Sequence, residues 1–148
     1  MNSTDRDSVV LHISEYPVTG GGYCDVYRSR LGNGTLVAVK QIRPQFDGET
    51  QPILNKNMQK TNRILAKLSH PNIVPLLGEV TVRGNMSTVH EWLQYGSVLE
   101  YLEHHPVADR YQLNAKICEG VAYLHAHGII HGDLKGVSYY NIYICPTL

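Results

Sequence analysis

The spacing of apolar residues changes near the middle of the chain, and this change constrains the fold more than any other feature. Before residue 93 the apolar residues alternate with polar ones in short, β-branched runs, which is typical of strands buried on one face. After residue 97 they recur at helical spacing in "SVLEYLEHH" and "ADRYQLNAKICEGVAYLHAHG", which are ended by Pro106 and Gly128. The 148 residues are therefore expected to form a β-rich part followed by an α-rich part.

The β-rich part carries the signals of about five antiparallel strands and one helix, which makes the fold class α+β. From residue 16 to residue 43 the alternation is broken at "TGGGYC" and at "LGNGT", where Asn33 and Gly34 suit a hairpin turn with positive φ. Two further runs, "IVPLLGEVT" and "NMSTVHEW", lie on either side of the turn "RGN". Between these two groups of strands, Pro52 suits the first turn of a helix that "HPN" stops.

This helix is expected to present one apolar stripe to the sheet. The stripe steps by three and four residues, so its members share one helix face. Thr61 lies in the middle of the stripe and is therefore expected to face inward. The segment from Gln51 to Ser69 contains no Asp or Glu. The members of the stripe are Leu54, Met58, Thr61, Leu65 and Leu68.

Composition excludes several classes of partner. Thirteen basic and thirteen acidic residues give a formal net charge of zero, so no long-range field favours nucleic acid or an anionic membrane. The polar N-terminus lacks the apolar core of a signal peptide, and no run approaches the ~20 apolar residues of a membrane span. Three cysteines without paired spacing argue against a disulfide framework and a zinc site. We expect a cytoplasmic protein with reduced thiols.

Two short motifs indicate phosphate chemistry. Gly20, Gly21 and Gly22 form a glycine cluster, which taken alone fits a plain turn as well as a phosphate-binding loop. The cluster is followed by a strand, a hairpin and "VAVK", which place Lys40 on the third strand, where its ammonium can reach phosphates under the loop. After the long helix comes "IIHGDLKGVSYYNIYI", in which Asp133 and Lys135 have the spacing of a phosphotransferase loop.

Taken in order, these motifs resemble the protein kinase family, and within it the tyrosine-kinase-like branch. The resemblance rests on "GGGYCDVY", "VAVK", "LSHPNIVPLLG", "HEWLQYGSVLEYL", "GVAYLHAHGIIHGDLKG" and "NIYI". It implies a kinase small lobe followed by the first helices and the catalytic loop of a large lobe. Residues 1–15 would be an N-terminal extension and residues 16–148 an incomplete kinase domain, with the small lobe at 16–92, the hinge exit at 93–97 and the start of the large lobe at 98–148.

The resemblance also implies ATP and Mg²⁺ as cofactors and assigns roles to single residues. Lys40 would hold phosphates, Asp133 would orient the substrate hydroxyl and Lys135 would stabilise the transferred charge. His90 would occupy the gatekeeper position at the back of the adenine pocket. The other nucleotide-binding residues implied are Val26 and Ala38 over the adenine ring, the main chain of Glu91 and Leu93 at the hinge, and Gly20, Gly21 and Gly22 in the loop.

Several positions depart from the family pattern. Thr19, Gly21 and Cys24 stand where the family has three glycines, and Thr61 stands where the helix carboxylate should pair with Lys40. The metal ligand expected five residues after Asp133 is Ser138, and the asparagine arrives only at Asn141, so both are doubtful metal ligands. "DFG" does not follow before Leu148. We therefore expect weak nucleotide binding with little dependence on magnesium.

Three hypotheses about function remain open. The first is an ATP-dependent phosphotransferase acting on protein Ser/Thr or Tyr hydroxyls, which we expect to be inactive as this chain. The second is a pseudokinase-type module that binds a protein partner, and the third is a truncated fragment of an active kinase. The long helix is expected to leave Ile117, Val121 and Leu124 uncovered, so self-association is a further expectation.

Overall fold

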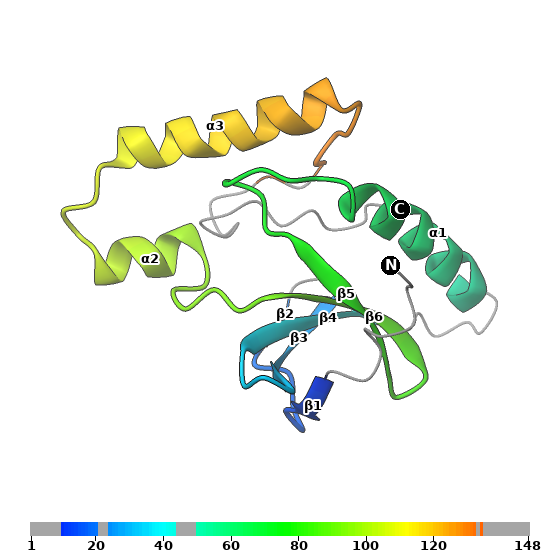
Figure 1. Cartoon of the computed structure of the whole chain (residues 1–148). Coiled ribbons are helices and arrows are strands. Elements are labelled where there is room, and N and C mark those ends of the chain that lie inside the picture. Colours follow the sequence, from blue (N-terminus) through cyan, green and yellow to red (C-terminus); the bar gives the residue numbers. More distant parts are fainter. Residues whose placement is uncertain (1–9, 21–23, 44–49, 133, 135–148) are drawn as a thin grey trace. The chain divides into compact units, whose positions relative to one another are not determined.

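The computed structural model describes residues 10–20, 24–43, 50–132 and 134, and it divides the chain into two compact units (Figure 1). The first unit combines Met1–Ala66 with Leu76–Trp92, and the second combines Lys67–Pro75 with Leu93–Leu148. The described elements of the first unit are β1 (Val10–Ile13), β2 (Thr19–Gly20), β3 (Cys24–Leu31), β4 (Leu36–Ile42), α1 (Thr50–Leu65), β5 (Leu76–Val82) and β6 (Asn85–Glu91). Those of the second are α2 (Val98–His104) and α3 (Arg110–Ala126).

The first unit is an antiparallel sheet with one helix, which confirms the α+β fold class. Its strand order is β1-β3-β4-β6-β5, with β2 paired to β3. The strand β1 lies within the segment assigned above to an N-terminal extension. It pairs with β3, and the Ser29 hydroxyl donates a hydrogen bond of 2.6 Å to the His12 carbonyl. A four-residue strand is too short to show a clear alternation, so its partner in β3, rather than its own sequence, defines it.

The two tight turns follow the sequence signals. Gly34 has φ 86°, and the Asn33 side chain accepts a hydrogen bond of 3.0 Å from the Thr35 amide. The β5–β6 turn has two residues with positive φ, Arg83 at 50° and Gly84 at 81°. This is the backbone that a two-residue hairpin requires, and arginine adopts it at some conformational cost.

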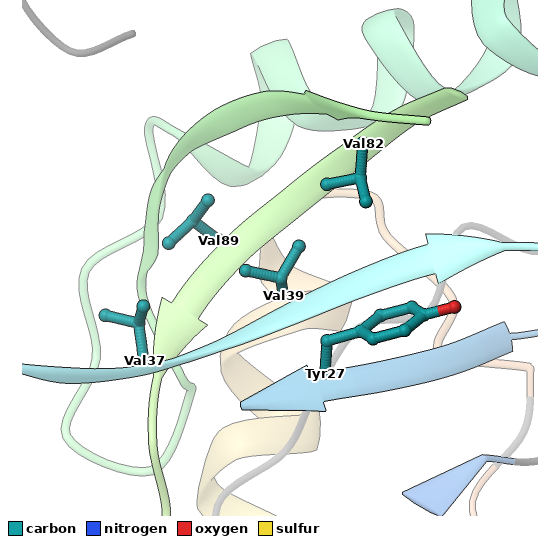
Figure 2. Packing of buried hydrophobic residues seen from close by; sticks show 5 residues of the cluster. All are labelled: Tyr27, Val37, Val39, Val82 and Val89. Atoms are coloured by element: carbon teal, nitrogen blue, oxygen red, sulfur yellow. The ribbon is translucent and has the colours of Figure 1, made fainter. Parts of the chain in front are cut away.

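The core of the first unit lies on one face of the sheet. Tyr27 pairs with Val39, and Val39 pairs with Val89, so these three side chains form a row across β3, β4 and β6. Figure 2 shows them gathered with Val37 and Val82, and Val37 and Val39 have no exposed surface. β-Branched side chains on a pleated surface pack closely against such cross-strand neighbours.

Helix α1 lies beside β5 and β6 (Figure 1), but its inward stripe is centred differently from the expectation. Met58 and Leu65 are buried as expected, while Thr61 is only half-buried. The buried residue between them is Asn62, whose exposed fraction is 2%. Met58, Asn62 and Leu65 follow i, i+4, i+7 spacing, so the helix geometry is as predicted, but one member of the stripe is polar. Leu68 is half-buried beyond the helix end, and the Leu54 side chain lies outside the described part.

The helices of the second unit are capped by their own sequence. Ser97 and Glu100 form a reciprocal capping box at the start of α2, and Asp109 accepts hydrogen bonds from the amides of Tyr111 and Gln112 at the start of α3. At the end of α3 the Gly128 amide donates to the His125 carbonyl and the Ile129 amide to the Leu124 carbonyl. With φ 71° at Gly128, this is the glycine stop that the sequence predicts.

The face of α3 that is exposed differs from the expectation. Leu124 is fully buried, and Ile117 and Val121 are half-buried, so the prediction that these three residues lack cover is wrong. Leu124 also accepts the Ile129 amide, because the chain folds back over the helix end at Gly128. The exposed residues of α3 include a row on another side of the helix: Tyr111, Ala115, Cys118, Ala122 and His125. In the described part of the chain, no helix combines the length and apolar character needed to cross a membrane.

Candidate functional site

The strands β3 and β4 place three of the candidate residues on one face of the sheet. Val26 pairs with Lys40, and Ala38 lies two residues before Lys40, so their side chains point to the same side. This side is opposite to the core cluster of Figure 2, which is built from the alternate residues Tyr27, Val37 and Val39. Val26 and Ala38 are buried, and Lys40 is half-buried. We call this the Lys40 face.

The start of the glycine cluster lies at the end of β2. Thr19 pairs with Val26, and Gly20 pairs with Asp25. A Cβ on Gly20 would lie 2.9 Å from the Cys24 carbonyl and 3.0 Å from Oδ1 of Asp25, so no side chain fits there. Asp25 forms an ion pair of 2.8 Å with Arg43, and this carboxylate raises the pKa of Arg43. The other two glycines, Gly21 and Gly22, lie outside the described residues.

A polar row crosses the Lys40 face toward α1. Lys40 pairs with Thr88 on β6, and Thr88 pairs with Glu79 on β5. Glu79 is half-buried and accepts a hydrogen bond of 2.8 Å from Nδ2 of Asn62. Neither Glu79 nor Asn62 is among the site residues predicted from the sequence. The alternation of "LLGEVTV" could have indicated Glu79, but no local signal marks Asn62 as its partner.

The hinge candidates follow at the end of β6. His90 is buried, and its Nε2 lies 3.1 Å from the Thr88 hydroxyl. Glu91 is exposed and pairs with Val37, and the Trp92 amide donates to the Leu36 carbonyl at 3.3 Å. Leu93 is half-buried and belongs to the second unit. The backbone therefore continues the β4–β6 pairing up to the position where hinge hydrogen bonds are expected.

The candidate catalytic loop is described only at its start. His131 is buried, and Gly132 has φ 75°, a conformation that favours glycine. Four predicted site residues, namely Asp133, Lys135, Ser138 and Asn141, lie outside the described residues. Within the described part, three or more His, Cys, Asp or Glu side chains nowhere gather in a way that could hold a metal ion.

A six-stranded antiparallel sheet, one helix on its Lys40 face and a helical second unit define a protein kinase fold. The family model described as "Protein tyrosine and serine/threonine kinase" matches residues 14–138. The chain belongs to the protein kinase family.

Relatives from distant organisms agree with this membership. The chain is 33% identical over 135 residues to "Probable serine/threonine-protein kinase DDB_G0267514" of Dictyostelium discoideum. This match covers 85% of this chain and 14% of that protein. It is 32% identical over 122 residues to "Tyrosine-protein kinase SRK3" of Spongilla lacustris, covering 77% of this chain and 34% of that protein. The chain thus spans a minor part of the length of these relatives.

A solved structure supports the fold alone. The crystal structure of Rad53 residues 1–466 in complex with AMP-PNP is similar to this chain with a TM-score of 0.68 and 24% sequence identity. The match covers 85% of this chain and 33% of that one. The resemblance inferred from the motifs is confirmed at the level of family and fold.

Proposed function

We propose that this chain binds ATP on the Lys40 face and serves phosphoryl transfer to Ser/Thr or Tyr hydroxyls of proteins. The observation that carries the proposal is the β3–β4 register, which puts the buried apolar residues Val26 and Ala38 on the same face of the sheet as Lys40. An apolar surface suits a purine ring, and an adjacent cation suits its phosphates. The residues present on this face therefore fit the nucleotide.

In this proposal each group has a separate task. Val26 and Ala38 contact the adenine ring, the main chain of Glu91 and Leu93 hydrogen-bonds to its edge, and Lys40 positions the phosphates. The amides around Gly20 lie close to the phosphates because no side chain intervenes. Magnesium, when bound, neutralises charge on the phosphates. Asp133 orients the substrate hydroxyl, and Lys135 stabilises the charge of the transferred phosphate. The substrate is a protein, and the reaction takes place in the cytoplasm.

A second candidate function is a protein-interaction module that keeps the kinase fold without the transfer reaction. Thr61 favours it, because a threonine provides no carboxylate for Lys40 and α1 (Thr50–Leu65) contains no acidic residue at all. Such a module could associate with another protein or with a second copy of this chain. Ser138 and Asn141, as doubtful metal ligands, favour the same reading.

Two measurements separate these functions. Thermal unfolding with increasing ATP, in the presence and absence of magnesium, tests nucleotide binding, and Lys40→Met should abolish any nucleotide-dependent rise in Tm. Transfer of labelled phosphate from ATP to a generic protein substrate tests catalysis, with Asp133→Asn as the control. Transfer that requires Asp133 supports the enzyme. A nucleotide-dependent rise in Tm without transfer supports the interaction module, and no rise in Tm contradicts nucleotide binding.

A further inference from the structure

The charged residues of α1 (Thr50–Leu65) are all basic. Lys56, Lys60 and Arg63 are exposed, and no residue of the helix is Asp or Glu. The three basic residues follow i, i+4, i+7 spacing, so they lie along one face of the helix. We call these three residues the basic stripe. Lys67 continues the spacing in the sequence but belongs to the second unit, so it is not counted in the stripe.

The basic stripe lies on the side of α1 that is turned away from the sheet. Met58 and Asn62 are buried, and Asn62 donates a hydrogen bond of 2.8 Å to Glu79 on β5, so this side of the helix contacts the sheet. Lys56 and Lys60 each stand two positions from Met58, which is about 200° around the helix. The stripe is therefore open to a partner from outside the first unit.

The described part of the chain provides no counter-charge for the stripe. No described carboxylate forms an ion pair with Lys56, Lys60 or Arg63. Like charges at i, i+3 and i, i+4 destabilise a helix. Arg63 lies in the last turn, where a cation suits the helix dipole, but the two lysines lie further from that end. An anionic group lying along the stripe would remove this repulsion.

The length of the stripe indicates the size of its partner. From Lys56 to Arg63 the helix rises about 10 Å. Side chains on one side of an extended peptide repeat every ~7 Å, and i, i+4 side chains of a helix repeat every ~6 Å, so about two or three carboxylates of one short segment span the stripe. Ile64 follows Lys60 by four residues and is 41% exposed, so it offers an apolar contact beside the charges.

Nucleic acid and lipid fit this surface less well than a protein segment does. The helix contains no aromatic residue on which a base could stack, and the zero formal net charge of the chain provides no long-range attraction for a polyanion. Helices that lie in a membrane surface bury a broad apolar face in the bilayer, whereas Met58 and Leu65 of α1 are already buried. A short acidic peptide needs neither a stacking platform nor a broad apolar face.

We propose that the basic stripe of α1 is a docking surface for a short acidic segment of a partner protein. The carboxylates of this segment lie along Lys56, Lys60 and Arg63, and an apolar side chain of the segment contacts Ile64. The partner supplies the counter-charge that the helix itself lacks. This inference does not rest on the proposed nucleotide site, because the stripe is turned away from the sheet.

Binding of a labelled peptide to the whole 148-residue chain, without nucleotide, tests the proposal. The probe is a short peptide of Glu, Leu and Ala with Glu at i, i+4 positions, and a matched probe has Gln in place of every Glu. Fluorescence anisotropy should show binding of the Glu peptide alone, and added salt should weaken it. The triple variant Lys56→Gln, Lys60→Gln, Arg63→Gln should lose about tenfold in affinity. Its Tm should not fall, because Gln is a good helix former.

A charge-conserving triple variant is the control. Lys56→Arg, Lys60→Arg and Arg63→Lys keep the stripe basic and should bind the Glu peptide as the original chain does. If the original chain does not bind this peptide, or if the Gln variant binds it equally well, the proposal is wrong. A labelled single-stranded oligonucleotide and vesicles containing phosphatidylserine are tested in parallel. If the stripe is needed for binding one of these and not the peptide, its partner is of another class and the proposal is overturned.

Discussion

Nδ2 of Asn72 donates a hydrogen bond of 3.0 Å to Oε2 of Glu119, a residue 47 positions later on α3. The same helix receives a second contact from this segment, because the Ser69 amide donates to the Tyr123 hydroxyl at 3.1 Å. The His70 ring lies 4.8 Å from the Tyr123 ring. These contacts explain why Lys67–Pro75 belongs to the second unit although it connects α1 to β5 in the first.

The first prediction concerns this link. Asn72 is buried, so Asn72→Ala removes a donor to a charged group and should lower the free energy of unfolding by about 1.5 kcal/mol. Glu119→Gln keeps an acceptor and should cost less, about 0.5 kcal/mol. Urea unfolding measures both, with Asn114→Ala on an exposed position of α3 as the control. If Asn72→Ala lowers the free energy of unfolding no more than the control does, the Asn72–Glu119 hydrogen bond does not stabilise the second unit.

The second prediction concerns the turn before α2. Gly96 has φ 61°, and a Cβ there would strike the Glu100 carboxylate that closes the capping box. Gly96→Ala should therefore cost about 2 kcal/mol, from the left-handed backbone together with the damaged cap. Gly34→Ala is the matched control, because Gly34 has φ 86° but open space around it, and it should cost only about 1 kcal/mol. If thermal unfolding shows that Gly96→Ala and Gly34→Ala lower the stability equally, the capping box is not disturbed by the added Cβ.

The third prediction is a pH dependence at the same cap. Hydrogen bonds from the Ser97 backbone and side chain, with a smaller contribution from the charge of His104, hold the pKa of Glu100 below its ordinary value of 4.5. A carboxyl whose pKa is lower in the folded state stabilises the fold above its unfolded pKa, and this stabilisation is lost as the pH falls through the folded pKa. Glu100→Gln should therefore show a weaker decline in stability below about pH 4.5 than the original chain. If the stability of the original chain and that of Glu100→Gln fall equally with decreasing pH, the assignment of this pH dependence to Glu100 is wrong.

The fourth prediction concerns Arg83 in the β5–β6 turn. Its guanidinium donates to the Glu15 carbonyl at 2.6 Å and lies 5.6 Å from the centre of the Tyr27 ring, while its φ of 50° is unfavourable for arginine. Arg83→Lys loses the forked donor and keeps the strained backbone, whereas Arg83→Asn loses the contacts but suits this turn. We expect the Tm to be highest for the original chain, lower for Arg83→Asn and lowest for Arg83→Lys. A reversal of the two variants would mean that backbone strain at this turn is negligible.

The sequence alone determined the elements, their order and the family. Alternation, turn residues and helix stops act between near neighbours in the chain, so "LGNGT", Pro52 and the Gly128 stop could be read directly. The resemblance assigned Val26, Ala38 and Lys40 to one nucleotide site, and the β3–β4 register puts these residues on one face of the sheet. The roles of Asp133, Lys135, Ser138 and Asn141 stay predictions, because those residues lie outside the described part.

Tertiary structure alone decided the polar part of the site. Helix periodicity pointed to Thr61, but the buried position next to it is Asn62, whose Nδ2 donates a hydrogen bond to a carboxylate 17 residues away. Two further features also depend on contacts outside the local pattern, since β1 is defined by its pairing with β3, and Leu124 is fully buried although its exposure was expected. A local pattern shows which residues can be buried. Contacts between distant segments decide which polar groups are buried with them, because each such group needs a partner that folding alone brings close.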